Sequence, residues 1–169
     1  MLAAQRTFQV DRPIDDIWVF VKDINNWAVQ MPGYISHEVL DEKRSSWTVQ
    51  VNLGPFKRPI VIDIEVTNWL QPSEVKFNLR GRFEPFHGGG RYRAEALEVS
   101  TVVTLEFEAE PLGAMAQMIE GLGRPVLERV ANEFSLNLAN ALQPDRHSPP
   151  LDSLSMLQRI KRWWLFRRA

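Results

Sequence analysis

The residues best suited to acid–base chemistry in this sequence are three histidines, and none stands in a recognised catalytic motif. His37 occupies a polar position of an expected strand, His87 precedes a run of three glycines, and His147 lies in a proline-rich segment. Catalytic histidines need a cleft and a partner group. We therefore expect solvated or locally bonded histidines, no catalytic residue and no cofactor. The rival hypothesis is a cyclase- or hydrolase-like enzyme that uses His37 or His87 with an arginine or a glutamate.

Nucleophile and metal-binding patterns are also missing from the sequence. The chain has no cysteine, which excludes thiolate chemistry and disulfides. The glycine run at 88–90 is followed by no helix N-terminus that could hold a phosphate, so we interpret it as a strand bulge or a sharp bend. We expect no metal site, because the acidic residues alternate on outward positions typical of a solvated sheet: Asp63, Glu65, Glu106, Glu108 and Glu110.

The clearest functional signal is a charge reversal at the end of the chain. Residues 1–150 hold 15 basic and 20 acidic side chains, whereas residues 151–169 hold five basic side chains and one acidic side chain. Paired tryptophans in a basic helical segment fit an interfacial helix on anionic lipid. Docking into a partner protein and folding back onto the domain stay open as alternatives, while the acidic body disfavours nucleic acid. The candidate membrane-binding residues are Arg159, Lys161, Arg162, Trp163, Trp164, Arg167 and Arg168.

The segments that would position these residues begin with a strand, a helical excursion and six further strands. Apolar and polar residues alternate with a period of two in each strand, and short turns separate them. A helix is expected over residues 13–21, with Pro13 at the start, and a second short helix or an irregular turn over residues 24–30. The strands are expected over residues 6–11, 35–40, 47–53, 60–67, 75–80, 92–96 and 103–110.

A long amphipathic stretch near the C-terminus completes the pattern. Its glycines and Pro125 predict a short helix over residues 113–121 and a longer one from Pro125 to Leu142. Segregated strands and helices indicate an α+β fold, in which a curved antiparallel sheet of about seven strands wraps around the long helix. The expected organisation is a domain over 1–142, a linker over 143–150 and a basic amphipathic helix over 151–169. The predicted buried stripe consists of Met115, Met118, Ile119, Leu122, Val126, Val130, Phe134, Leu138 and Leu142.

Three motifs resemble those of a known superfamily. They are Pro13-Ile-Asp-Asp-Ile-Trp18, the Asp23, Trp27 and Met31-Pro32-Gly33 series, and the run from Val51 to Lys57. With the glycine-interrupted final helix, they are similar to the START-like superfamily, also called the polyketide cyclase or Bet v 1-like group (SRPBCC). Within it, the sequence most resembles the carbon monoxide dehydrogenase G-subunit family. His87 with its glycines, the Arg80–Arg82 segment and the basic tail depart from that family's pattern.

This resemblance implies a helix-grip fold with a hydrophobic cavity between the sheet and the C-terminal helix. Members of the superfamily bind lipids, sterols or polyketides. The carbon monoxide dehydrogenase G-subunit proteins are thought to serve a molybdenum dehydrogenase at the membrane, by handling a quinone. We therefore expect a protein that binds or carries an apolar small molecule (lipid, quinone or polyketide-like), as a membrane-associated accessory to a redox enzyme.

The residues expected to line the cavity are apolar, with Trp27 and Met31 at the entrance and Arg80 or Tyr92 orienting a head group. From the residues alone, an ordinary packed core is the alternative. The N-terminus lacks a signal peptide, and no apolar run is long enough to span a bilayer. We expect a cytoplasmic protein, with peripheral attachment to the inner face of the membrane. The cavity set is Trp27, Met31, Trp47, Val49, Ile62, Ile64, Phe77, Leu79, Tyr92, Met115, Met118, Ile119, Leu122, Val126 and Val130.

Overall fold

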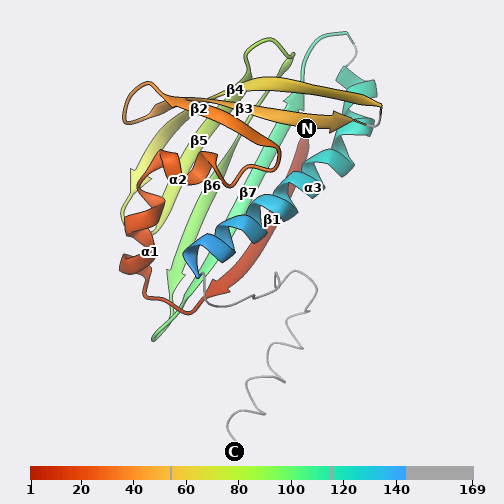
Figure 1. The fold of residues 1–169 in the computed structure, drawn as a ribbon. Coiled ribbons are helices and arrows are strands. Elements are labelled where there is room, and N and C mark those ends of the chain that lie inside the picture. The colour runs from red at the N-terminus through yellow and green to blue at the C-terminus, as the bar shows by residue number, and fades with distance from the viewer. Residues whose placement is uncertain (54, 115, 144–169) are drawn as a thin grey trace, which may run out of the picture.

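A computed structural model describes residues 1–53, 55–114 and 116–143 of the chain (Figure 1). Seven strands and three helices form an α+β domain, as the sequence predicts. In chain order the elements are β1 (Leu2–Val10), α1 (Ile14–Val21), α2 (Ile24–Ala28), β2 (Tyr34–Val39), β3 (Arg44–Leu53), β4 (Phe56–Leu70), β5 (Glu74–Gly81), β6 (Phe86–Ala96), β7 (Thr101–Pro111) and α3 (Ala116–Leu142).

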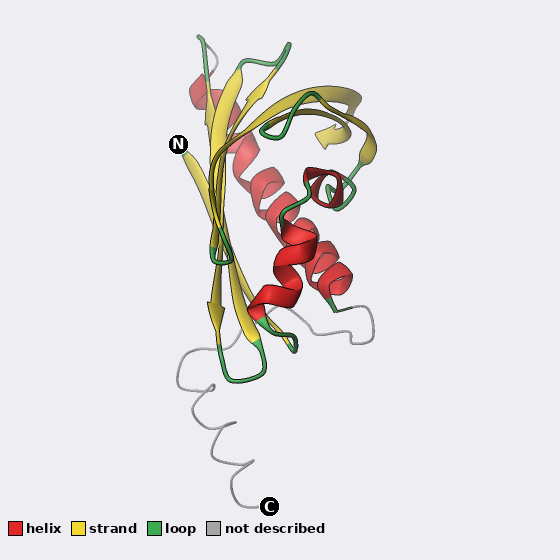
Figure 2. Ribbon diagram, turned by 90° about the vertical axis from the view of Figure 1, so that its left-hand side faces the viewer, coloured by secondary structure: helices red, strands yellow, loops and turns green. Residues whose placement is uncertain are grey.

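All seven strands belong to one antiparallel sheet in the order β1-β7-β6-β5-β4-β3-β2. The first strand pairs with the last one, with Leu2 opposite Ala109, so strands from the two ends of the strand region lie side by side. The sheet curls, and the three helices lie on its concave side (Figure 2). The seven-stranded helix-grip prediction is therefore confirmed.

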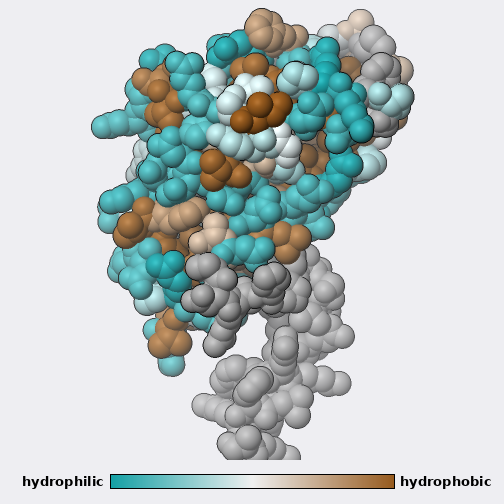
Figure 3. Space-filling model, viewed as in Figure 1, coloured by the Kyte–Doolittle hydropathy of each residue, from teal (hydrophilic) through white to brown (hydrophobic). Residues whose placement is uncertain are grey.

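The period-two alternation of the sequence separates the two faces of the sheet. In β7, Thr101, Val103 and Leu105 are buried against the helices, whereas Glu108 and Glu110 point into solvent. Such alternation is what an antiparallel sheet with one wet face requires. The outer surface on the helix side of the domain is mostly hydrophilic, with apolar side chains scattered over it (Figure 3).

The long C-terminal helix is one continuous element rather than the two helices that the sequence predicts. Pro125 lies inside α3 on its exposed side, where solvent can bond the carbonyl that proline leaves without its usual donor. Gly123 allows the helix to approach β1, because a Cβ at this position would lie 2.9 Å from Leu2 Cδ1. The split prediction was wrong because it applied a helix-start rule to a position that the helix passes through. Likewise, Pro13 precedes α1 as its N-cap.

The glycine run does not form the predicted bulge. Gly88–Gly90 lies inside β6, and the pairing with β5 continues through it, with Phe77 opposite Gly90. A Cβ on Gly90 would come 2.4 Å from Phe77 Cζ and 2.5 Å from the Glu106 carbonyl oxygen. Glycine is required here because an aromatic ring and a neighbouring strand approach the backbone closely.

Candidate functional site

The second half of α3 packs tightly over the concave face of the sheet. Phe134 is 2% exposed, and its ring stacks on Trp27 with centroids 6.0 Å apart. Trp27 also meets the Tyr92 ring edge-on at 5.6 Å and donates from Nε1 to the Val21 carbonyl at 2.7 Å. Phe107 meets Phe134 edge-on at 5.8 Å. This aromatic cluster joins α2, α3 and the strands β6 and β7.

Two hydroxyl groups in this packed region have no hydrogen-bond partner among the described residues. The side chain of Tyr92 is fully buried and that of Ser135 is 1% exposed, yet Tyr92 Oη and Ser135 Oγ are both unpartnered. A buried polar group without a partner typically costs about 1–3 kcal/mol. Burial raises the pKa of the Tyr92 phenol, so the hydroxyl stays protonated and can donate. Each group is thus available to an additional polar atom.

The first half of α3 covers the sheet much less completely. The helix packs mainly on β1 and β7, and the inner face beyond them is only partly buried near the start of the helix. On α3 itself, Met118 is 54% and Leu122 is 67% exposed. The partly buried apolar side chains of this open half are Val51, Ile60, Phe77, Leu79 and Phe86.

Polar contacts hold α3 in position across the two halves. Arg129 Nη2 donates to the Asn52 carbonyl of β3 at 3.1 Å, and Asn137 Nδ2 donates to the Gln30 carbonyl after α2 at 2.8 Å. At the C-terminal end, the backbone N–H of Asp11 donates to the Gln143 side chain at 3.0 Å. Gln143, the first residue of the expected linker, is therefore part of the packed domain, while 144–150 and the tail at 151–169 lie outside the described residues.

The predicted cavity residues fall into three settings. Most of those on the sheet and α2 face inward, but the predicted burial of the early α3 stripe was wrong, because that half of the helix extends beyond the packed core. Whether these residues line a ligand site stays a prediction. Buried are Trp27, Trp47, Val49, Ile62, Ile64 and Tyr92; partly buried are Met31, Phe77, Leu79, Val126 and Val130; exposed are Met118, Ile119 and Leu122; Met115 lies outside the described residues.

Sequence reasoning missed Ser135. The serine occupies the buried stripe of α3, four residues after Ala131 and seven before Leu142, both of which are buried. A hydroxyl at that helical spacing is a visible signal, because such a position otherwise takes an apolar side chain. The predicted stripe included only the apolar residues Phe134 and Leu138 in this region and so omitted the polar residue between them.

The histidines are locally bonded, as expected, or outside the described residues. Asn25 Nδ2 donates to Asp23 Oδ1 at 2.9 Å, which leaves its own Oδ1 to accept from His37 Nε2 at 2.8 Å. His37 Nδ1 must then accept from the Tyr34 hydroxyl, also at 2.8 Å. His87 is half exposed and lies 3.6 Å from Glu110. Arg80, the other suggested head-group ligand, lies on the solvent face of the sheet beside Asp63.

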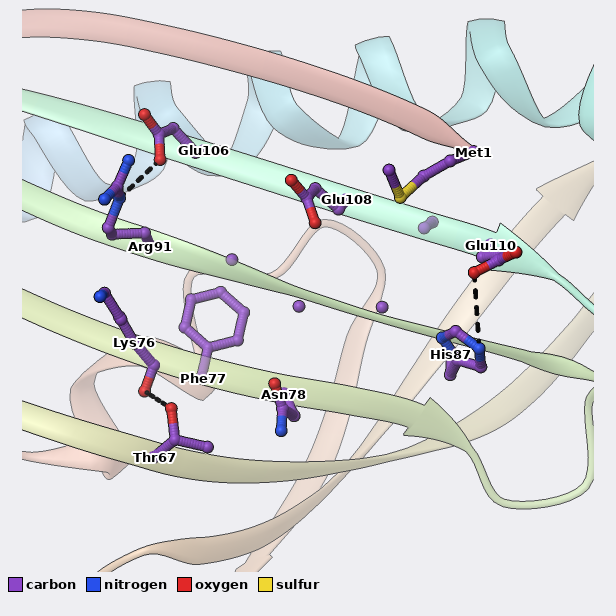
Figure 4. A pocket seen from close by; sticks show the side chains of 14 residues that line it. Met1, Thr67, Lys76, Phe77, Asn78, His87, Arg91, Glu106, Glu108 and Glu110 are labelled. Atoms are coloured by element: carbon purple, nitrogen blue, oxygen red, sulfur yellow. Dashed lines mark hydrogen bonds and ion pairs between the residues drawn. The ribbon is translucent and has the colours of Figure 1, made fainter.

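A hollow of about 380 Å³ lies on the outer face of the sheet, away from α3. Its floor is the glycine run, and charged side chains surround it (Figure 4). These charges largely satisfy one another: Arg91 Nε donates to Glu106 at 2.7 Å and lowers the pKa of that carboxyl. No set of groups converges on one point, and we assign no ligand to this hollow.

Within the described residues, no three histidine or acidic side chains gather closely enough to hold a metal ion. Across the same residues, no helix combines the length and apolar character that crossing a bilayer needs.

We compared the chain with protein-family models and with curated sequences. A protein-family model whose description reads "-like" matches residues 1–162. The chain belongs to this family. A search of curated protein sequences finds no match.

Solved structures of low sequence identity share the fold. A conserved protein from Geobacillus kaustophilus has a TM-score of 0.69 at 19% identity, over 86% of this chain and 98% of that one. A START superfamily protein from Mycobacterium smegmatis reaches 0.63 at 15% identity, over 84% and 97%. The Zhui aromatase/cyclase from a Streptomyces species reaches 0.54 at 18% identity, over 83% and 90%. The fold is therefore START-like.

Proposed function

We propose that this START-like protein binds and carries an apolar small molecule between the sheet and α3. The observation that carries the proposal is the buried Tyr92 hydroxyl, which has no partner among the described residues. A ligand oxygen that accepts its hydrogen bond would remove a penalty that typically amounts to about 1–3 kcal/mol. The partly buried inner face near the start of α3 supplies apolar surface for the rest of the molecule.

The ligand class follows from these two features. It is largely apolar and carries at least one hydrogen-bond acceptor, because both the Tyr92 and Ser135 hydroxyls can donate. A quinone, a lipid ester and a polyketide-like molecule all meet this description through their carbonyl oxygens. The START-like fold supports the same class, since it holds an apolar layer between sheet and helix.

A carrier fits the buried chemistry better than an enzyme does. The buried residues of the described chain include no Asp, Glu, His, Lys or Arg. The raised pKa of Tyr92 makes its phenol a hydrogen-bond donor rather than a base at neutral pH. The second candidate is a cyclase-like enzyme, which the structural similarity to an aromatase/cyclase favours. Turnover of a polyketide-like substrate that Tyr92→Phe abolishes would support the enzyme.

The basic tail at 151–169 suggests where in the cell the protein acts. In the accessory role suggested by the resemblance to the carbon monoxide dehydrogenase G-subunit family, residues 151–169 would attach the protein to a membrane or to a redox enzyme. Its support is the reversed charge and the Trp163-Trp164 pair. Pull-down of a molybdenum dehydrogenase by the full chain, lost in the Trp163→Ala/Trp164→Ala variant, would support the partner; no capture by either would argue against it.

The test of the ligand site compares the only two tyrosines of the chain. Tyr92→Phe removes an unpartnered hydroxyl, so ligand-free protein should become more stable, by about 1 kcal/mol or more. Tyr34→Phe removes a hydroxyl bonded to His37, so stability should fall by about 0.5–1.5 kcal/mol. Urea unfolding of both variants measures these changes.

Ligand binding should change in the opposite direction. A short-chain quinone has accepting carbonyl oxygens and quenches tryptophan fluorescence, and Trp27 lies against the Tyr92 ring. Tyr92→Phe should weaken quinone binding by about fivefold or more, while Tyr34→Phe leaves it unchanged. Lower stability in Tyr92→Phe together with unchanged quinone and lipid binding would contradict the proposal that this hydroxyl donates a hydrogen bond to the ligand.

A further inference from the structure

From the surface at the end of the domain where α3 begins, we infer that this end binds an anionic lipid bilayer. Several chain segments meet there, at the top of Figure 1. The Leu112 N–H donates to the Pro85 carbonyl at 2.7 Å and thereby ties the end of β7 to the β5–β6 turn. The N-terminal amine lies 2.8 Å from Glu120 and ties β1 to α3. We call this surface, which includes Phe83, Leu112, Met118 and Leu122, the α3-start face.

Large apolar side chains project from this face. Phe83, in the β5–β6 turn, is 80% exposed, and Leu122 and Met118 on α3 are 67% and 54% exposed. Turn tips and the first turns of a helix can enter the head-group region without disturbing the sheet. Amphipathic surfaces of this kind bind at the boundary between head groups and acyl chains.

Basic residues surround these apolar side chains. Their excess over acidic residues favours anionic lipid as the binding partner of this face. The α3-start face holds five basic residues and four acidic ones (Asp63, Glu84, Glu110 and Glu120), whereas the remaining residues of 1–143 hold nine basic and fifteen acidic ones. Asp63 is bonded to Arg82 at 2.6 Å. Glu84 is bonded to Arg58 at 2.7 Å. A net positive end on a negative body is complementary to anionic lipid. The basic residues are Lys57, Arg58, Arg80, Arg82 and Arg124.

The opposite end of the domain shows why charge decides the inference. It also exposes apolar side chains, among them Val99 at 77% and Leu97 at 51% in the β6–β7 turn. Their charged neighbours in sequence, Glu95 and Glu98, are acidic and would be repelled by anionic head groups. Both ends therefore expose large apolar side chains, and of the two only the α3-start face combines them with a net positive charge.

The α3-start face also lies next to the open half of the inner face. An apolar molecule could thus pass between a bilayer and the protein without crossing water. The inferred lipid contact nevertheless stands on exposure and charge alone, and it does not depend on the ligand proposed above.

Vesicle binding by the full chain tests the inference. The probes are vesicles of phosphatidylcholine with and without phosphatidylserine. Phe83→Ser/Leu122→Ser should weaken binding to phosphatidylserine vesicles by roughly tenfold or more. The matched control, Leu97→Ser/Val99→Ser, removes two exposed apolar side chains at the opposite end and should leave binding unchanged. Lys57→Gln should weaken binding by about fivefold, and Lys43→Gln should not.

A second set of variants, made in a chain with a weakened basic tail, measures the contribution of this surface independently of the tail. In the full chain carrying Trp163→Ala, Trp164→Ala, Arg167→Gln and Arg168→Gln, the α3-start face variants should still lower vesicle binding relative to the control pair. Equal binding by Phe83→Ser/Leu122→Ser and the control pair in both backgrounds would overturn the inference. Equal binding to vesicles with and without phosphatidylserine, or no vesicle binding at all, would also overturn the inference and favour a protein partner.

Discussion

The two halves of α3 lie over the same sheet but meet it differently. The second half places Phe134, Leu138 and Leu142 in a core that excludes water, and the first half leaves Met118 and Leu122 exposed. Secondary structure and strand register are regular beneath both. The difference teaches that one helix can supply the stability of the domain at one end and leave apolar surface available at the other.

Truncation of a packed aromatic should have the largest effect. Phe134→Ala removes a ring that contacts both Trp27 and Phe107 and should cost about 3–5 kcal/mol of unfolding free energy. Leu122→Ala, in the same helix, should change it by less than about 0.5 kcal/mol. Urea denaturation of the two variants measures both values. Similar losses would mean that the two halves are equally packed.

Substitution by a larger side chain should also affect stability differently in the two halves of α3, but by less than the Phe134→Ala truncation does. Ala131 is fully buried, so Ala131→Trp should cost about 1–3 kcal/mol or more through overpacking. Val126→Trp, five residues earlier, should leave the fold largely intact and block the binding of an apolar ligand. Thermal unfolding and quinone-induced quenching of each variant give the comparison. A large stability loss in Val126→Trp with unchanged binding would assign Val126 to an ordinary core.

A smaller, pH-dependent effect should come from the polar contacts on the outer face of the sheet. Hydrogen bonds from Arg82 and Ser46, at 2.6 and 2.7 Å, reach Asp63 Oδ1, and the Arg82 bond is the main reason why the pKa of this carboxyl lies below its ordinary 3.8. A lowered folded-state pKa stabilises the fold above the unfolded value, and this contribution is lost as pH falls through the folded-state pKa.

Asp63→Asn should therefore lower stability at neutral pH by about 1 kcal/mol, and the difference from the native protein should shrink below about pH 4. Urea unfolding as a function of pH measures it. The change should leave quinone binding in the open half unaffected. A difference that grows in acid would contradict the assigned direction.

The sequence predicted most of the fold because the sheet has one wet face. Alternation in segments such as Val103–Glu110 follows directly from that exposure. Five of the seven strands contain the predicted segment in full, and the other two, β1 and β2, end one residue before the predicted end. The errors came from tertiary contacts. Gly90 is glycine because the Phe77 ring lies against its backbone, not because the strand bulges there. Pro125 is tolerated inside α3 because its side of the helix faces solvent.

The candidate site was less predictable than the fold. The inward direction of Trp47, Ile62 and Tyr92 follows from strand period, but their degree of burial depends on where α3 lies. Local sequence does not report that the Tyr92 hydroxyl lacks a partner, because a partner is any group that the fold brings near. The exposure of Met118 and Leu122 likewise depends on how far α3 extends past the packed core.

Native mass spectrometry of the full chain, purified without denaturant, tests the central claim most directly. We predict a species heavier than the bare chain by the mass of a bound apolar molecule, which organic extraction releases and identifies. The same species should be missing from Val126→Trp and reduced in Tyr92→Phe. A bare chain in every preparation, together with no uptake of added quinone or lipid, would contradict the account.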